Sequence, residues 1–526
     1  MIQVDGLTLA YHGESLFEDA LFSIQPGERC ALVGRNGMGK SSLFRLLTGK
    51  ETPDKGTIAK RKNYLIGTLD QHIVFTQPTL IEEAALGLRE AERDCVYKAE
   101  TILFGLGFKE EDMERSPQEF SGGYQLRLHL AKVLVGEPDC LLLDEPTNYL
   151  DIVSIRWFTK FLLEWKGEFM LISHDREFLD SVSTHTMGIH RQKITKVKGS
   201  TIDFFEQIMQ QETIHEKTRV NLDKKREHLQ GFIDRFGAKA SKATQAQSKQ
   251  KLLSRIPVLE NLKDLYQLDF QFNEANFPGK KMLEAQGVSF SYVSAEHPMI
   301  KNLSLTVEKG ERIAIVGKNG RGKSTILRLL AGELAPNSGE VKRSDNLAIG
   351  YFGQTNIDRL HPRNSVEDEI SIANPKLNLT QIKGICGLMM FSGDKSKKLN
   401  SVLSGGEKSR VLIGKIIASP CNLLLLDEPT HHLDMESIEA LIDALEDFEG
   451  AVIMVTHSEL ILKRMLLDKI VVCHEGRQEI HLGTYEDFLD KDGWNDDSGA
   501  KANKANKAKK VEQGGTSTPQ KNKNKK

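Results

Sequence analysis

The 526-residue chain contains two copies of one motif order, and this repeat limits its possible folds more than any other feature. A glycine-rich segment that ends in Lys-Ser begins at Gly34 and again at Gly317, and 317 − 34 = 283. A solenoid needs at least three short repeats, so the sequence predicts a duplicated domain. Four further markers keep the interval of 283 residues: Gln71 and Gln354, Ser121 and Ser404, Asp144 and Asp427, and His174 and His457.

Composition places the chain among globular proteins. Apolar residues make up 39% and charged residues 27%, enough for more than one core. Lys+Arg is 71 and Asp+Glu is 73, so affinity for nucleic acid would have to come from a local patch. No apolar run approaches the roughly 20 residues of a membrane helix, and the first residues do not resemble a signal peptide. Six scattered cysteines without a CxxC pair argue against a disulfide framework or a zinc site. We expect a cytoplasmic protein.

Apolar segments alternate with helical patterns in each copy, which predicts an α/β fold with a largely parallel sheet. We expect two nucleotide-binding domains, at residues 1–204 and 279–490. Residues 205–278 between them are polar and rich in helix formers, which predicts a helical-hairpin linker with Phe232 and Phe236 near its tip. The lysine-rich, low-complexity tail at 491–526 is expected to be disordered.

Both glycine-rich segments fit the phosphate-loop pattern G-x-x-x-x-G-K-[ST], in which backbone N–H groups surround phosphate oxygens. Lys40 and Lys323 are expected to reach the β- and γ-phosphates of ATP, and Ser41 and Ser324 to hold Mg²⁺. One match could arise by chance, but two matches that each join an apolar strand to a helix argue against chance. The predicted loop residues are Gly34, Arg35, Asn36, Gly37, Met38, Gly39, Lys40, Ser41 and Ser42, and Gly317, Lys318, Asn319, Gly320, Arg321, Gly322, Lys323, Ser324 and Thr325.

Paired acids follow a second apolar strand in each copy. Asp144 and Asp427 end their strands, where a carboxylate can orient Mg²⁺. Glu145 and Glu428 come next and can position the attacking water as general bases. The alternative is structural, because DEPT also describes a turn that starts a helix.

A histidine follows a third apolar strand in each copy, at His174 and His457. Histidine there can contact the γ-phosphate and link its presence to the sheet. Either histidine alone would more often be structural, but the matched spacing favours a functional role.

The motifs together resemble an ATP-binding cassette domain that is present twice. The resemblance rests on the phosphate loops, Gln71, the SGG sequences, LLLDEPT and the ISHD sequence. It implies that the two halves form a head-to-tail sandwich with ATP between the phosphate loop of one and the SGG of the other. Gln71 and Gln354 would then act at the metal and the attacking water. Residues 34–41 would pair with Ser404, Gly405 and Gly406, residues 317–324 with Ser121, Gly122 and Gly123, and Tyr11 and Tyr292 would stack on adenine.

Twin cassettes joined by a helical linker of this length resemble the ABC-F family. The linker sequence 235–249 resembles the signature of that family, as do DEPTNYLD and DEPTHHLD, and residues 154–157 resemble its YbiT-type branch. The family implies an ATPase that binds ribosomes near the E site, contacts rRNA and tRNA through residues 232–255, and modulates translation or relieves stalled ribosomes. We expect no membrane partner and no obligate oligomer.

Charge in the linker agrees with an RNA partner. Residues 235–255 contain no acid and six cations: Arg235, Lys239, Lys242, Lys249, Lys251 and Arg255. Four of these cations fall near one helical face, which is typical of a surface that binds a polyanion. A solvated helix surface would explain the same charges, and on this pattern alone the two alternatives stay equal.

Several positions depart from the cassette pattern. Phe120 and Tyr124 flank the first SGG, where other residues are usual, and Ser458 replaces the aspartate that usually follows the second histidine. The last change makes the second switch less certain than the second base. Gly237 and Thr244 stand where the linker signature is expected to be basic.

Two other functions compete with the ribosome factor. The ATP-hydrolysing subunit of a membrane transporter would explain the cassettes but not the fused pair with its basic linker. A DNA-transaction ATPase would place a long coiled coil between phosphate loop and signature, whereas Lys40 and Ser121 are only 81 residues apart.

Overall fold

The computed structural model describes residues 1–11, 14–68, 75–120, 122–236, 250–251, 271–292, 298–353, 360–430, 433–474, 476–491 and 493–494. The chain divides into two compact units, and each contains a short segment from the other half of the sequence. Unit 1 comprises Met1–Tyr149, Trp157–Asp269 and Leu433–Ala440. Unit 2 comprises Leu150–Arg156, Phe270–His432 and Leu441–Lys526. We call Leu150–Arg156 and Leu433–Ala440 the exchanged segments.

The central sheet of unit 1 has six strands in the order β5-β6-β7-β3-β8-β9, all parallel except β9. The inner strands are almost wholly apolar and buried, as expected for a parallel sheet covered on both faces. Their bounds are β3 Arg29–Val33, β5 Ile66–Thr68, β6 Cys140–Asp144, β7 Glu168–Ile172, β8 His185–His190 and β9 Lys193–Lys198.

A second, antiparallel sheet of unit 1 has the order β2-β1-β4, with bounds Glu14–Ile24, Ile2–Tyr11 and Lys55–Lys60. One core joins the two sheets through helix α1 (Lys40–Thr48), which buries Leu43, Leu46 and Leu47. α1 begins directly after the phosphate loop, so the core fixes the base of that loop.

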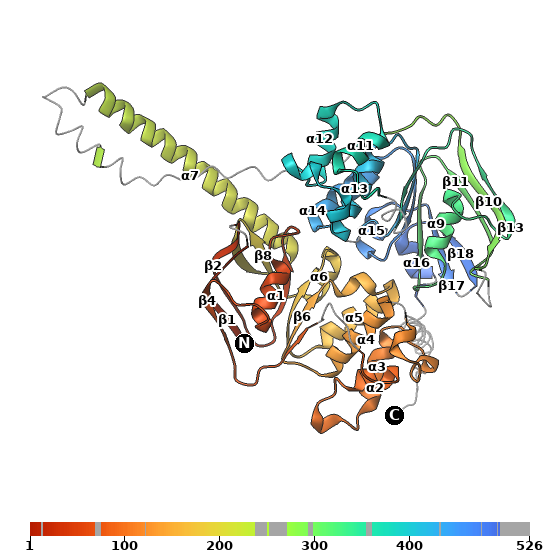
Figure 1. Cartoon of the computed structure of the whole chain (residues 1–526), viewed down its shortest axis with the longest axis horizontal. Helices are drawn as coiled ribbons and strands as arrows, with labels where there is room; N and C mark the ends of the chain where they lie inside the picture. The colour runs from red at the N-terminus through yellow and green to blue at the C-terminus, as the bar shows by residue number, and fades with distance from the viewer. Residues whose placement is uncertain are drawn as a thin grey trace, which may run out of the picture. The chain divides into compact units, whose positions relative to one another are not determined.

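Unit 1 contains further helices: α2 to α5 lie together on one side, and α7 projects from the unit (Figure 1). A helical group follows β5, in which α4 contacts both α2 and α3. The bounds are α2 Leu80–Ala85, α3 Val96–Gly105, α4 Gly122–Val135, α5 Ile152–Glu164 (up to Arg156 part of unit 2), α6 Arg176–Val182 and α7 Thr201–Phe236.

Unit 2 repeats the architecture of unit 1. Its six-stranded sheet has the order β14-β15-β16-β12-β17-β18, and its antiparallel sheet the order β11-β10-β13. The strands are β10 Lys281–Phe290, β11 Ile300–Glu308, β12 Arg312–Gly317, β13 Ser338–Arg343, β14 Ile349–Phe352, β15 Leu423–Asp427, β16 Ala451–Val455, β17 Lys469–His474 and β18 Arg477–Leu482. The helices are α9 Lys323–Ala331, α11 Val366–Ala373, α12 Leu379–Leu388, α13 Gly405–Ala418, α14 Met435–Asp447 (up to Ala440 part of unit 1), α15 Glu459–Arg464 and α16 Tyr485–Lys491.

The predicted α/β fold with two tandem nucleotide-binding domains is confirmed. The linker is helical up to Phe236, and α7 runs without interruption through the predicted boundary at residue 204. Residues 237–270 of the predicted linker lie outside the described residues except at 250–251, and residues 271–278 are not helical, contrary to the prediction. The tail also lies outside the described residues except at Lys491, Gly493 and Trp494. Trp494 is buried and donates a hydrogen bond to Tyr485, so packed structure continues past residue 490.

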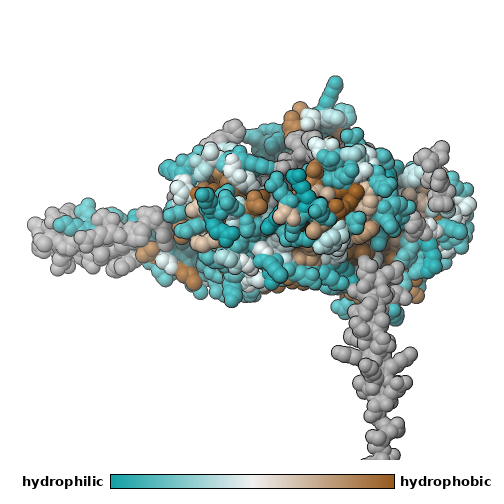
Figure 2. All heavy atoms as spheres, turned by 90° about the horizontal axis from the view of Figure 1, so that it is seen from below, coloured by the Kyte–Doolittle hydropathy of each residue, from teal (hydrophilic) through white to brown (hydrophobic). Residues whose placement is uncertain are grey.

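The visible surface is mostly hydrophilic, with scattered apolar residues (Figure 2). In the part of the chain that the structure describes, every helix is too short or too polar to cross a membrane.

Candidate active sites

The two phosphate loops join a central strand to a helix, from β3 to α1 in unit 1 and from β12 to α9 in unit 2. Lys40 and Lys323 lie at the start of these helices and are buried, with 8% and 7% of their surface exposed. Lys40 Nζ donates to the carbonyl oxygens of Gly34 and Arg35 at 2.6 and 3.3 Å. Burial lowers the pKa of the Lys40 ammonium, although the carboxylates of Glu145 and Asp434 oppose the shift.

The second loop has nearly the same geometry. Lys323 Nζ donates to the carbonyl oxygens of Gly317 and Lys318 at 3.0 and 3.1 Å. Burial also lowers the pKa of Lys323. Each lysine is thus held under its own loop by main-chain oxygens, which fits a cation that stabilises phosphate.

Glycine is needed in both loops for steric reasons. Gly34 and Gly317 have φ angles of +149° and +143°. A Cβ at Gly317 would lie 2.5 Å from the carbonyl oxygen of Cys473, and one at Gly34 would lie 3.1 Å from that of Ile189. At these two glycines the loops therefore lie close against strands β8 and β17.

The predicted metal ligands lie together in each unit. Ser41 Oγ donates to Asp144 Oδ2 at 2.6 Å, and Ser324 hydrogen-bonds Asp427. Burial raises the pKa of Asp427, while the hydrogen bond from Ser324 and the charge of Lys323 oppose this. Hydroxyl and carboxylate oxygens are the ligands that Mg²⁺ prefers, so these residues fit the ion.

Glu145 and Glu428 occupy an unusual backbone conformation, with φ of +50° at both. Such a conformation is rare for residues other than glycine and is often found at functional sites. The backbone N–H groups of Glu145 and Glu428 donate to Ile172 and Val455 of the next strand at 2.9 Å, which fixes the turn. Burial and the neighbouring Asp144 raise the pKa of Glu145 to about 8. Burial also raises the pKa of Glu428 to about 8, although Lys323 opposes this.

Each predicted histidine contacts the glutamate of its own unit. Nε2 lies 3.4 Å from Oε1 in both pairs, His174 with Glu145 and His457 with Glu428. His457 Nε2 also lies 3.2 Å from Oδ1 of the loop residue Asn319. The structure therefore brings the predicted base, histidine and phosphate loop together.

The departure at Ser458 changes the first turn of a helix. Asp175 caps α6 by accepting from the N–H of Phe178 at 3.0 Å. Ser458 occupies the same position before α15 and makes no side-chain cap hydrogen bond. The second histidine is thus followed by a less constrained turn.

Sequence reasoning did not identify two aspartates that contact the phosphate loops. Within unit 1, Asp434 Oδ2 accepts from the N–H of Asn36 at 3.4 Å, and within unit 2, Asp151 Oδ2 accepts from the N–H of Asn319 at 3.1 Å. Both lie in exchanged segments. The repeat contained the signal, because 434 − 151 = 283 and the two aspartates end the repeated sequences DEPTNYLD and DEPTHHLD.

The predicted adenine-stacking tyrosines lie beside the helices that follow the loops. Tyr11 hydrogen-bonds Glu51, and its hydroxyl lies 3.5 Å from Arg45 of α1. Tyr292 lies 3.2 Å from the hydroxyl of Thr325 on α9. Each tyrosine is 38% exposed, which leaves ring surface for stacking.

The signature sequences differ between the two units. Ser404 caps α13 and forms a capping box with Glu407. Gly405 and Gly406 lie between these two residues, in the first turn of the helix. In unit 1, Gly122 and Gly123 begin α4, whereas Ser121 lies outside the described residues. Gln71 and Gln354 also lie outside them.

Unit 1 has aromatic contacts at the positions where unit 2 has the capping box. Tyr124 stands at the position of Glu407 and packs against Phe108, with ring centroids 5.4 Å apart. Phe120 also packs against Phe108 at 5.7 Å, and Arg127 lies over the Tyr124 ring. The departures Phe120 and Tyr124 therefore form a packed cluster at the base of α4.

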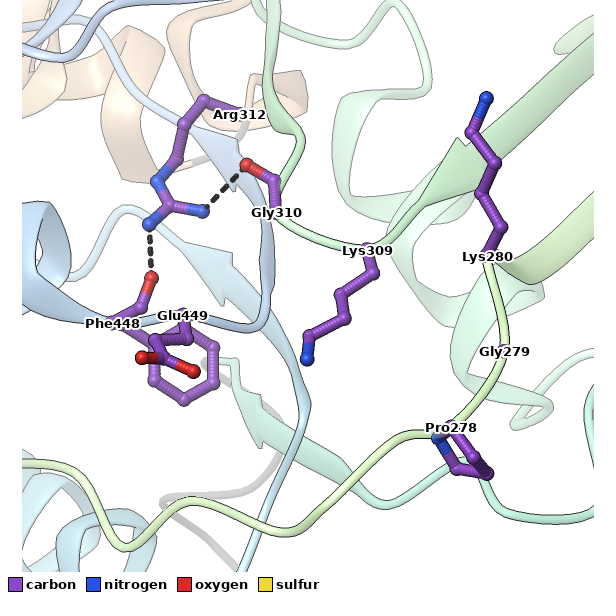
Figure 3. A pocket seen from close by; sticks show the side chains of 8 residues that line it. All are labelled: Pro278, Gly279, Lys280, Lys309, Gly310, Arg312, Phe448 and Glu449. Carbon is purple, nitrogen blue, oxygen red and sulfur yellow. Dashed lines mark hydrogen bonds between the residues drawn. The ribbon is translucent and has the colours of Figure 1, made fainter.

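Figure 3 shows a surface hollow of unit 2, whose lining includes Lys280, Lys309 and Arg312. The phosphate loop follows the other, carboxyl end of β12. The hollow surrounds Arg312 at the amino end of β12, where the guanidinium donates to the carbonyl oxygens of Gly310 and Phe448. Ligands of parallel α/β sheets bind at the carboxyl ends of the strands. Arg312 therefore has a structural role, joining the start of β12 to the end of α14.

Comparisons with known proteins agree with these sites. A family model described as ABC transporter matches residues 17–148 and 300–431, and a further model with the same description matches residues 187–272. Among relatives, the probable ATP-binding protein YheS of Escherichia coli K12 is 33% identical over 93% of this chain and 81% of its own. The probable ATP-binding protein YbiT of Escherichia coli O157:H7 is 34% identical over 94% of this chain and 100% of its own. ATP-binding cassette sub-family F member 3 of Rattus norvegicus is 32% identical over 90% and 71%.

Solved structures share the fold at low identity. One is archaeal aABCE1, described as a ribosome recycling factor, in complex with the ribosomal stalk protein aP1. It has a TM-score of 0.64 at 19% identity and covers 91% of this chain and 90% of its own. Another, RNase-L Inhibitor, has a TM-score of 0.63 at 20% identity and covers 92% of both chains. The relatives are similar in identity, so the YbiT-type branch stays a prediction. By its paired cassette models and its full-length relatives, the chain belongs to the ABC-F family and is an ATP hydrolase.

Proposed function

We propose that this ATPase binds ribosomes, with nucleotide controlling when it binds and leaves. In each site, Lys40 or Lys323 neutralises the β- and γ-phosphates, and the loop glycines let backbone N–H groups approach them. Glu145 and Glu428 take the proton of the attacking water. His174 and His457 hold these glutamates in place from 3.4 Å.

Magnesium has a defined place in this proposal. Ser41 with Asp144, and Ser324 with Asp427, would hold Mg²⁺, with Gln71 and Gln354 as further ligands. The ion supplies charge to stabilise the phosphate oxygens during transfer. The Ser41–Asp144 hydrogen bond of 2.6 Å supports the assignment, because it holds the two oxygens next to each other.

The signatures complete the two sites in this proposal. Ser404, Gly405 and Gly406 would contact ATP held by loop 34–41, and Ser121, Gly122 and Gly123 would contact ATP held by loop 317–324. ATP would then favour a closed arrangement, because it binds groups from both halves.

Helix α7 is the observation that carries the ribosome assignment. It contains 36 residues, Thr201–Phe236, so at 1.5 Å per residue it is about 54 Å long. Its first third lies against the sheet of unit 1, where Glu212 pairs with His190 and Arg191, and the rest extends away from that sheet (Figure 1). An arm of this length carries the start of the basic sequence 235–255 away from the sheet of unit 1.

The basic sequence lies almost entirely beyond the described residues. Only the backbone of Arg235 and residues 250–251 are described, so the RNA contact of residues 232–255 rests on charge and on the family. We propose that this sequence contacts rRNA and tRNA near the E site. A ribosomal partner also implies a cytoplasmic location. A further solved structure with this fold is described as ribosome-bound archaeal Pelota and ABCE1, but at 19% identity this likeness concerns the fold alone.

Ribosome sedimentation tests the proposal. The Glu145→Gln/Glu428→Gln variant should pellet with ribosomes in ATP and remain in the supernatant without nucleotide. Replacing Arg235, Lys239, Lys242 and Lys249 by glutamine should weaken pelleting. The slope of the logarithm of the binding constant against the logarithm of salt concentration should become shallower by about 0.7–0.9 for each lost phosphate contact. Replacing Lys501, Lys504, Lys507 and Lys509 of the tail removes the same charge and is the matched control. Equal pelleting of the two four-site variants would contradict a specific linker contact, and the absence of ATP-dependent pelleting would contradict the ribosome assignment.

A further inference from the structure

Two ion pairs at equivalent positions of the repeat have their charges reversed. In unit 1, Arg176 Nη1 lies 3.1 Å from Glu439 Oε1, and in unit 2, Arg156 Nε lies 3.0 Å from Glu459 Oε1. Arg156 and Glu439 are equivalent, because 439 − 156 = 283, and so are Arg176 and Glu459, because 459 − 176 = 283. The first half of the sequence therefore supplies arginine at both positions, and the second half supplies glutamate at both.

Each pair joins an exchanged segment to the start of a helix from the other half. Arg156 lies on α5 and Glu439 on α14, both inside exchanged segments. Arg176 is the first residue of α6, and Glu459 is the first residue of α15. An acid at that position suits the helix dipole, whereas a cation does not. An arginine at the first position of α6 therefore does not stabilise that helix, and its observed role is the ion pair with Glu439.

We infer that these four residues form a charge code that directs each exchanged segment into the opposite half of the chain, and away from the same half of a second copy. If two first halves met, Arg156 would face Arg176. If two second halves met, Glu439 would face Glu459. Like charges at these positions repel, whereas the arrangement within one chain attracts at both.

All four charged side chains are partly buried, so solvent screens their interactions only in part. The side chains are 26% and 27% exposed in the Arg176–Glu439 pair, and 30% and 23% exposed in the Arg156–Glu459 pair. Partly buried pairs are screened less than exposed ones. Glu459 is also oriented from its own side, where Lys463 lies 3.5 Å away and Tyr485 donates a hydrogen bond at 3.3 Å.

A third ion pair does not belong to the code. Arg35 pairs with Glu436 in unit 1, but the equivalent positions are Lys318 and Val153. Two second halves would place Lys318 near Glu436, which attracts. This third pair therefore does not oppose the pairing of two second halves, unlike the four residues of the code.

A duplicated chain can pair its halves in more than one way, and the charge code would favour pairing within one chain. The two halves share one fold and one set of motifs, so pairing of identical halves from two copies competes with pairing inside one chain. Repulsion in the wrong assembly is a common way to select the right one.

Two double variants with the same composition and net charge test the code. Arg156→Glu/Glu439→Arg makes both pairs repulsive within a chain and attractive between identical halves of two copies. Arg156→Glu/Glu459→Arg changes as many charges but keeps both pairs attractive within a chain. The first variant should need about three to ten times more ATP for half-maximal hydrolysis, because both partly buried pairs change from attractive to repulsive. With a slowly hydrolysed ATP analogue, it should form dimers in sedimentation velocity.

The second variant should hydrolyse ATP like the wild type, because both pairs within a chain stay attractive. It also makes the contacts between identical halves attractive, so it should form fewer dimers than the first variant rather than none. Equal behaviour of the two variants would overturn the code. If the first variant folds poorly, adding Arg176→Glu and Glu459→Arg restores attraction at both pairs and should restore ATP hydrolysis, and failure to do so would also overturn the code. No ribosome enters these measurements, so their outcome is independent of the proposed ribosome binding.

Discussion

Asp434 contacts the N–H of Asn36 in the first phosphate loop and also caps helix α14. Its Oδ2 accepts from Asn36 at 3.4 Å, while its Oδ1 accepts from the N–H of Ser437 at 3.0 Å. Burial raises the pKa of Asp434, but hydrogen bonds from Ser437 and Asn36 lower it below its usual value. Asp151 makes the same pair of contacts with Asn319 and Ser154. Movement of either loop is therefore coupled to the start of a helix from the other half of the sequence.

Replacing Asp434 by alanine should weaken nucleotide binding at the loop of Lys40 and leave the loop of Lys323 nearly unchanged. Loss of the cap costs about 1 kcal/mol, and loss of the Asn36 contact frees the loop. Site-resolved nucleotide crosslinking would measure both occupancies. Asn378→Ala, which removes the cap of α12 without touching a loop, is the matched control. Equal loss in both variants would mean that Asp434 acts only through helix stability.

Replacing Glu145 and Glu428 by glutamine should preserve ATP binding and slow hydrolysis by roughly 10²-fold or more, the usual effect of losing a general base. Glutamine keeps the shape and the contact near the histidine but cannot accept the proton. Single-turnover hydrolysis with bound ATP would separate chemistry from binding. Hydrolysis at nearly the wild-type rate would show that these carboxylates are not the base.

Hydrolysis should increase as the pH rises through about 8. Burial raises the pKa of Glu145 and Glu428 to about 8, so both are mostly protonated at neutral pH, and only the ionised form can act as a base. The rate should rise by up to about tenfold per pH unit below pH 8 and level off above it. Turnover of each single Glu→Gln variant between pH 6 and 9 would report the remaining site. A rate that falls across this range would contradict the assignment.

Much of the fold could be predicted because the sequence states it twice. The matched spacing from Gly34 to His174 and from Gly317 to His457 predicts the strands and loops, and the structure brings each histidine next to the glutamate of its own unit. The exchanged segments could not be predicted, because periodicity describes one half at a time. Asp434 comes from the second half of the sequence but contacts Asn36 of the first. Such a contact is set by tertiary packing and leaves no trace in the periodicity of either half.

The local departures were visible in the sequence, but their consequences were not. Phe120 and Tyr124 stood out against the second signature, yet their contact with Phe108 depends on where α3 ends. The left-handed backbone at Glu145 likewise has no sequence signal, because glycine usually marks such positions.

Replacing Gly317 by alanine should destabilise the protein by about 1–3 kcal/mol, the scale of backbone strain combined with a steric clash. The φ of +143° is unfavourable for alanine, and its Cβ would lie 2.5 Å from the carbonyl oxygen of Cys473, which belongs to β17 and cannot move freely. Gly384→Ala in helix α12 is the matched control, because nothing lies within 4 Å of a Cβ there and alanine favours helix. Thermal unfolding should show a lower midpoint for Gly317→Ala and an equal or higher one for Gly384→Ala. Because the clash lies behind the loop, ATP binding at the Lys323 site should weaken in the same variant, whereas an unchanged midpoint and affinity would mean that the loop does not need glycine at this position.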